Sequence, residues 1–103
     1  SQIGDSNVGV VQQSGDSNDD ITLQDGDLNY SRANQFGDEN VALETQLGNS
    51  NFSFTQQAGD LNCSEVFQDG NSNFNTTTQL GDSNNSMVNQ VGNGNTNNTF
   101  QSN

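Results

Sequence analysis

The sequence predicts an all-β fold, a cross-β solenoid in which two strands and two turns make one rung and successive rungs stack in parallel and in register. Three observations support this prediction. A unit of eleven residues repeats along the whole chain without insertion or deletion. Each unit joins a turn signal, Gly-(Asp/Asn)-x-Asn, to a segment rich in Val, Thr, Phe, Ile and Leu. Proline, which would remove a donor from a strand ladder, is absent.

Three positions of the unit are almost invariant. Glutamine recurs at Gln2, Gln13, Gln24, Gln35, Gln46, Gln57, Gln68, Gln79, Gln90 and Gln101. Glycine follows two residues later, at Gly4, Gly15, Gly26, Gly37, Gly48, Gly59, Gly70, Gly81 and Gly92. Asparagine follows three residues after that, at Asn7, Asn18, Asn29, Asn40, Asn51, Asn62, Asn73, Asn84 and Asn95. Nine such units and a partial tenth make residues 1–103 one repeat domain.

Each unit divides into a turn half and a strand half. In the turn, for example Gly37-Asp38-Glu39-Asn40, glycine supplies backbone angles that other residues avoid, and Asn and Asp bond back to the main chain. The following segment, for example 41–45, has the β-branched and large apolar residues typical of strands. An eleven-residue unit is too short for a helical hairpin, so strand and turn are the elements that it predicts.

Two units return the chain to its starting side, so one rung is predicted to take 22 residues. Rungs stack at about 4.8 Å, the spacing of neighbouring strands. Each residue then lies over the one 22 positions earlier, as Asn29 over Asn7. Glutamine and asparagine side chains are therefore expected to form columns, with hydrogen bonds from amide to amide along the axis.

The strand residues present two different faces, because side chains alternate along a strand. One face carries Asn, Gln and mostly small residues, and sixteen of the eighteen variable positions on it are uncharged, Asp20 and Glu44 being the exceptions. The other carries most of the large apolar residues. The first face is favoured as internal, which would leave an apolar outer face for neighbouring filaments to cover. The inverse arrangement would bury Arg32 and Glu65 and would require them to pair.

Composition excludes several classes of function. The net charge is −12 with Arg32 as the single cation, so the chain lacks the basic footprint of a nucleic-acid-binding protein. No apolar run is long enough to insert into a membrane. Histidine is absent, which removes Ser-His and Cys-His nucleophile pairs, and no metal or cofactor site is expected. An enzyme is not predicted, and Cys63 is interpreted as a small strand residue.

The repeat Gln-x-Gly-x-x-Asn, with glutamine again six residues after the asparagine, resembles that of curlins, the subunits of bacterial curli amyloid fibres. The resemblance covers essentially the whole chain. It implies a secreted, extracellular fibre subunit that polymerises end to end and serves biofilm matrix and cell adhesion. It also implies a nucleator subunit and an outer-membrane secretion channel as partners, and places Gln and Asn inside. Both halves of each rung carry the full Gln-Gly-Asn set here, whereas the best-known curlin halves are unequal.

Other interpretations stay open at this point. The chain can be a monomeric β-solenoid adhesin or binding module, a disordered acidic tail, or an ice-binding solenoid, although only Thr55, Thr77 and Thr99 form a threonine column. The aspartates at 16, 38, 60 and 82 are expected to stack in a column at one set of turns. Acid or divalent cations would then assist folding or assembly by neutralising it; the alternative is solvated turn carboxylates. Both terminal rungs are expected to expose open strand edges.

Overall fold

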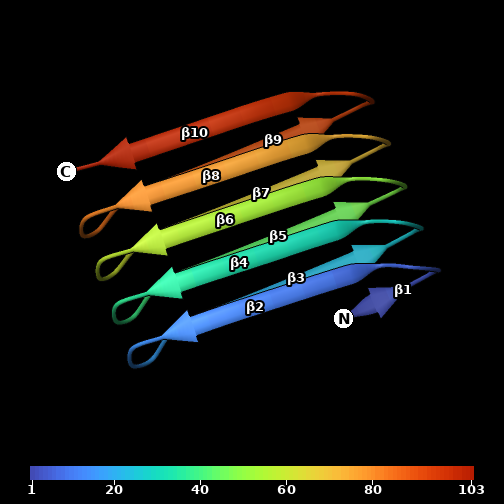
Figure 1. The fold of residues 1–103 in the computed structure, drawn as a ribbon. Coiled ribbons are helices and arrows are strands. Elements are labelled where there is room, and N and C mark those ends of the chain that lie inside the picture. Colours follow the sequence, from blue (N-terminus) through green and yellow to red (C-terminus); the bar gives the residue numbers. More distant parts are fainter.

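The computed structural model describes residues 1–103 and contains ten β-strands and no helix (Figure 1). No helix is present that could cross a membrane. The strands are β1 Gln2–Ile3, β2 Val8–Ser14, β3 Asp19–Asp25, β4 Tyr30–Phe36, β5 Val41–Leu47, β6 Phe52–Ala58, β7 Cys63–Asp69, β8 Phe74–Leu80, β9 Asn85–Val91 and β10 Thr96–Ser102. Apart from the short β1, each strand spans seven residues and begins directly after the asparagine of the repeat.

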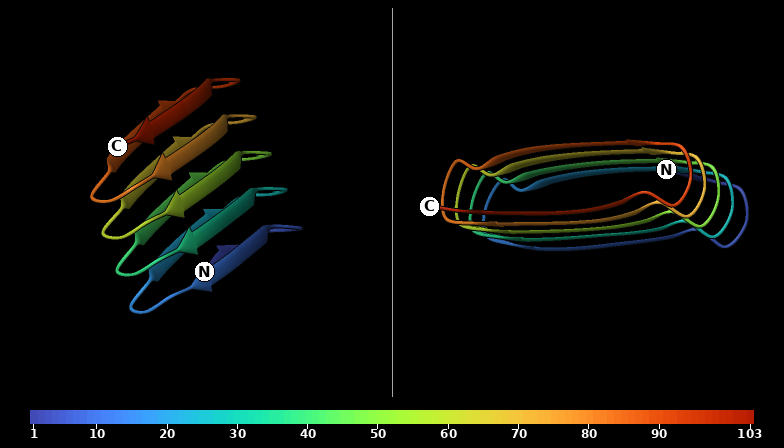
Figure 2. Two further views of the ribbon diagram at one scale, coloured as in Figure 1. Left: turned by 60° about the vertical axis from the view of Figure 1, so that its left-hand side comes forward. Right: turned by 90° about the horizontal axis from the view of Figure 1, so that it is seen from above.

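The strands form two parallel sheets, which confirms the predicted solenoid. The odd sheet has the order β1-β3-β5-β7-β9, and the even sheet has the order β10-β8-β6-β4-β2. Each residue pairs with the one 22 positions further on, as Gln24 with Gln46 and Phe52 with Phe74. Viewed along the stack, the rungs superpose as flat ovals (Figure 2). The Cα atoms extend over 33 × 22 × 12 Å, so the two sheets lie close together.

The hydrogen-bond ladder continues around the turns. Of 66 main-chain hydrogen bonds, 43 lie within the strands, and most of the others join a turn to the same turn in the next rung. The Gly48 nitrogen donates to the Asp25 oxygen over 2.9 Å, and the Ser50 nitrogen donates to the Asp27 oxygen over 2.9 Å. Turns and strands therefore share one register, which explains why no unit of the sequence gains or loses a residue.

The face that carries Asn, Gln and small residues is internal. Along β6, buried and half-buried residues alternate, and the buried ones are Ser53, Thr55 and Gln57. The only buried hydrophobic residues are Ala33, Ala42, Val66 and Val88. The inverse arrangement is wrong, because Arg32 is half-buried and Glu65 is exposed on the outer faces. Large apolar side chains lie outside, and Met87 is 76% exposed.

The turns require glycine for two reasons. Every repeat glycine has a positive φ, which is 100° at Gly48 and 121° at Gly70. In addition, a Cβ atom on Gly48 would overlap the carbonyl oxygen of Gly70 in the next rung. The same overlap would occur at every repeat glycine from Gly4 to Gly70, each with the glycine 22 positions further on. Close stacking of turns on turns therefore excludes any side chain at this position.

A second turn position also has a left-handed backbone, which the sequence analysis did not predict. The variable residue between Asp/Asn and Asn has φ between 55° and 60° wherever it is not glycine. Six such sites hold serine or glutamate, but Leu28 and Leu61 also adopt this conformation. Left-handed angles cost an ordinary residue roughly 1–2 kcal/mol, so both leucines destabilise the fold locally.

Gly48→Ala is expected to lower the free energy of unfolding by about 3 kcal/mol or more, because the methyl group overlaps the next turn and the backbone angle disfavours alanine. Gly94→Ala is the matched control: Gly94 has a φ of 69°, but no atom lies within 4 Å of the methyl position. We expect this control to lose about 1 kcal/mol. Urea unfolding followed by circular dichroism measures both, and equal losses would contradict the steric role of stacking.

Leu61→Asn is expected to raise the free energy of unfolding by about 0.5–1 kcal/mol, because asparagine tolerates the left-handed conformation. Little packing is lost, since Leu61 is 56% exposed. Met87→Asn, at an exposed residue without a positive φ, serves as the control and should give no gain. A stabilisation of both variants in thermal unfolding would argue for a general solubility effect instead.

Candidate functional site

The glutamines form two interior columns that run the length of the stack. In each column the Nε2 of one glutamine donates to the Oε1 of the glutamine in the next rung, as from Gln24 to Gln46 over 2.8 Å. These bonds join all ten predicted glutamines, at distances between 2.7 and 3.0 Å. The columns are Gln2-Gln24-Gln46-Gln68-Gln90 and Gln13-Gln35-Gln57-Gln79-Gln101.

The same amides also join the two sheets. The Nε2 of Gln24, on β3, donates to the main-chain oxygen of Val8 on β2 over 3.0 Å. Gln57, on β6, donates likewise to the Val41 oxygen on β5 over 2.9 Å. This pattern repeats for every glutamine of the interior columns from Gln24 to Gln101, always to the residue sixteen positions earlier. One NH₂ group thus links neighbouring rungs and facing sheets.

The asparagine columns bond differently from the prediction of amide-to-amide ladders. The Oδ1 of Asn29 accepts the main-chain N–H of Asn51 over 3.0 Å, and its Nδ2 donates to the Gly48 oxygen over 2.8 Å. Within the columns of repeat asparagines, only three bonds join two side chains, Asn40 to Asn18, Asn84 to Asn62 and Asn95 to Asn73. The side chain of asparagine is one methylene shorter than that of glutamine and stands beside the turn, so its amide reaches main chain first.

A third ladder lies at the turn position after glycine. The main-chain N–H of Asp38 donates to the Oδ1 of Asp60 over 2.8 Å, and that of Asp27 donates to the Oδ1 of Asn49 over 2.9 Å. Carboxylate and amide oxygens are interchangeable acceptors here. Every unit has Asp or Asn at this position. From the sequence alone this restriction indicated only a turn preference, although it was also the signal for this ladder.

The predicted aspartate column exists, and each of its carboxylates except that of Asp16 accepts a main-chain hydrogen bond. Asp16, Asp38 and Asp60 donate their main-chain N–H groups to the Oδ1 of the aspartate one rung further on, over 2.8 to 2.9 Å. These N–H bonds offset part of the repulsion between stacked carboxylates. No group of three or more acidic, cysteine or histidine side chains is placed to hold a metal ion.

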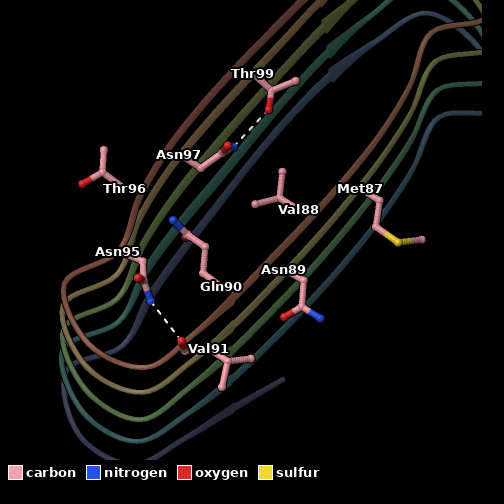
Figure 3. Close-up of a pocket in the computed structure, with 9 residues that line it drawn as sticks. All are labelled: Met87, Val88, Asn89, Gln90, Val91, Asn95, Thr96, Asn97 and Thr99. Carbon is pink, nitrogen blue, oxygen red and sulfur yellow. Dashed lines mark hydrogen bonds between the residues drawn. The ribbon is translucent and has the colours of Figure 1, made fainter.

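The C-terminal end of the stack leaves its interior ladders without a next rung. In Figure 3, Val88, Gln90, Asn97 and Thr99 point into the hollow between the two sheets at this end. The Nδ2 of Asn95 donates to the Val91 oxygen and to the Asn73 Oδ1, each over 3.1 Å, but it lacks the bond that interior asparagines such as Asn73 donate to a glycine oxygen of the next rung. The amide of Gln90 has no further glutamine to receive its second N–H.

The N-terminal end presents the opposite groups. The Oε1 atoms of Gln2 and Gln13 accept no hydrogen bond, whereas every interior glutamine oxygen accepts one from the rung before. A hollow lined by Gln2, Gly9, Val11 and Thr22 opens between the sheets at this end too. The two ends are therefore different: one offers glutamine acceptors, and the other offers glutamine donors.

The outer face of the even sheet carries an aromatic column. The rings of Tyr30 and Phe52 stack at 5.1 Å, and those of Phe52 and Phe74 stack at 4.8 Å. The guanidinium of Arg32 lies 5.9 Å from the centre of the Phe54 ring. This face has no carboxylate, whereas the outer face of the odd sheet carries Asp19, Asp25, Glu65 and Asp69.

Comparisons with known proteins do not assign the chain to a family. No protein-family profile matches the sequence, and no curated protein matches it either.

Gln57→Ala is expected to lower the free energy of unfolding by about 3 kcal/mol or more, since it leaves the Gln35 amide, the Gln79 oxygen and the Val41 oxygen each short of a bond in a buried space. The neighbouring Gln56→Ala is the matched control. Gln56 lies on the outer face, so a change within about 0.5 kcal/mol is expected. Similar losses for both variants in chemical denaturation would contradict the role given to the interior amides.

Proposed function

We propose that this protein is the structural subunit of an extracellular, curli-like functional amyloid fibre that grows by end-to-end addition of copies. The observation that carries this proposal is the match between the two ends. At the C-terminal end the ladder residues stand at 90, 95 and 101, and at the N-terminal end they stand at 2, 7 and 13, with the same spacing.

A second copy placed one rung beyond the first would continue both glutamine columns and the asparagine column that ends at Asn95. Gln2 of the second copy would lie over Gln90, Asn7 over Asn95, and Gln13 over Gln101. The donors at the C-terminal end would then meet the acceptors at the N-terminal end. Because the ends differ, two identical ends cannot make these bonds, so the proposed fibre is polar. Contacts of this head-to-tail kind generate open filaments rather than closed dimers.

The edges of the even sheet support the same arrangement. β10 and β2 each pair on one side only, and β2 of a second copy has the length and register to pair with β10. Seven residues of parallel ladder would form at each junction, in addition to the side-chain columns. Unpaired strand edges of this length act as templates for association.

The resemblance to curlins supplies the biological part of the proposal. It favours secretion to the bacterial cell surface, a role in biofilm matrix and adhesion, and a nucleator subunit and an outer-membrane channel as partners. The apolar outer faces support lateral pairing of filaments, because their exposed side chains include Val8, Phe74 and Phe100 on the even sheet.

The alternative function is a monomeric adhesin or binding module. The stacked rings of Tyr30, Phe52 and Phe74 on a face without carboxylates favour it, since exposed aromatic surface is common in recognition sites. Folding assisted by cations, which belonged to this alternative, has no cluster of ligands to support it.

Electron microscopy of the purified chain separates the two functions, and Gly92→Ala tests the junction. In one molecule a Cβ on Gly92 meets only the Asn95 Nδ2, at 3.6 Å, whereas each preceding repeat glycine except Gly81 faces a glycine oxygen of the next rung. A stacked copy would bring its Gly4 oxygen to Gly92. We expect fibres from the unmodified chain, and elongation on preformed seeds slowed about tenfold or more in Gly92→Ala.

Gly94→Ala is the control for the positive φ, and circular dichroism of the monomers shows whether each variant folds. Elongation by Gly94→Ala at close to the normal rate is expected. Monodisperse particles at every concentration would contradict the fibre, and equal elongation by both variants would contradict the proposed junction.

A further inference from the structure

Glu44 is a carboxylic acid enclosed in the middle of the stack. Its side chain, on β5, has no exposed surface and points across the interior to the even sheet. Three hydroxyl groups surround its carboxyl oxygens: Ser31 is bonded to Oε2, and Ser53 and Thr55 donate to Oε1 over 3.2 and 2.7 Å.

No cation offsets the charge of this carboxyl group. Within the odd sheet, Glu44 stacks between Thr22 on β3 and Val66 on β7. Asp20 on β3 is the only other ionisable side chain that faces the interior, and it is also acidic. Arg32 on β4 and Cys63 and Glu65 on β7 belong to the outer faces. An ionised Glu44 would therefore be a buried charge with hydroxyl partners alone, which is costly.

The proton on Glu44 relieves this cost. Burial raises the pKa of Glu44 to about 7; the hydrogen bond from Thr55 opposes the rise, Asp20 adds to it, and the bond from Ser53 opposes it. Burial also raises the pKa of Asp20, although Thr22 donates a hydrogen bond to it over 3.2 Å. For both interior acids, Glu44 and Asp20, the folded chain therefore favours the protonated form.

We propose that Glu44 is an acid sensor of the fold, which stabilises the solenoid when it is protonated and destabilises it when it is ionised. The three hydroxyls and the dry space between the sheets make this sensor, and no other carboxyl group in the chain is enclosed in this way. Under the proposed function, on which this step rests, the ends that add copies exist only in the folded chain. Acid surroundings would then promote fibre growth, and neutral to alkaline surroundings would restrain it.

The direction of the effect follows from linkage. The pKa of Glu44 is higher in the folded chain than in the unfolded one, so the folded chain retains the proton over a wider pH range. The stabilisation is full below the ordinary value of 4.5 and is lost as the pH rises to about 7. Between about pH 5 and pH 8, the folding equilibrium constant should fall on the order of 100-fold from this group.

Chemical denaturation of monomeric chain at these two pH values tests the proposal in three proteins: unmodified, Glu44→Gln and Glu65→Gln. Glutamine has the shape of the protonated acid and keeps a donor for the hydroxyls. We expect Glu44→Gln to lose most of this 100-fold fall, with Asp20 contributing to what remains. Glu65→Gln, on the outer face of β7, should behave as the unmodified chain. Equal pH dependence in all three would overturn the proposal.

A titration of the Glu44 side-chain carbon by nuclear magnetic resonance keeps the test independent of how well the variant folds. A midpoint near neutrality is expected, and a midpoint near the ordinary value would overturn the sensor. Both measurements use monomers, so their failure is distinct from a failure to form fibres. If Glu44 titrates as expected and no fibres form, the sensor stands and the proposed function fails.

Discussion

The interior glutamine amide is the group on which the structure depends. Its Nε2 donates both to the next glutamine along the stack and to a main-chain oxygen of the facing sheet, as Gln46 does to Gln68 and to Tyr30. A single side chain therefore sets the spacing of the rungs and the separation of the sheets. Any shift of register would break both bonds at every glutamine, which makes the eleven-residue period a structural requirement.

This arrangement explains how a chain with few hydrophobic residues can fold. With 26% hydrophobic residues, a core of ordinary apolar side chains cannot offset the entropy of ordering. The interior instead satisfies buried polar groups in periodic ladders, and only Asp20 Oδ1 and Ser64 Oγ are buried without a partner. Ala33, Ala42 and Val66 fill the space between the ladders. Large apolar residues are free to lie outside because they are not needed inside.

The sequence predicts the solenoid and the columns well because they depend on period and residue type alone. It also favours the correct inner face, since size and charge separate the two faces. Details that depend on distances within the rung cannot be predicted from the sequence. Asn29 prefers main-chain partners because its short side chain stands beside a turn. The left-handed backbone of Leu61 follows from the geometry of its own turn. The environment of Glu44 could not be predicted without the structure, because it depends on Ser31, Ser53 and Thr55, which face Glu44 across the interior.

Hydrogen exchange of the glutamine side-chain amides, observed by nuclear magnetic resonance, tests most directly whether these amides hold the fold. The NH₂ groups of Gln46, Gln57 and Gln68 should exchange as slowly as the main-chain N–H groups of the central strands, while that of Gln56 on the outer face should exchange rapidly. Rapid exchange at all four glutamines, with the strands still protected, would show that the sheets stand without the amide columns.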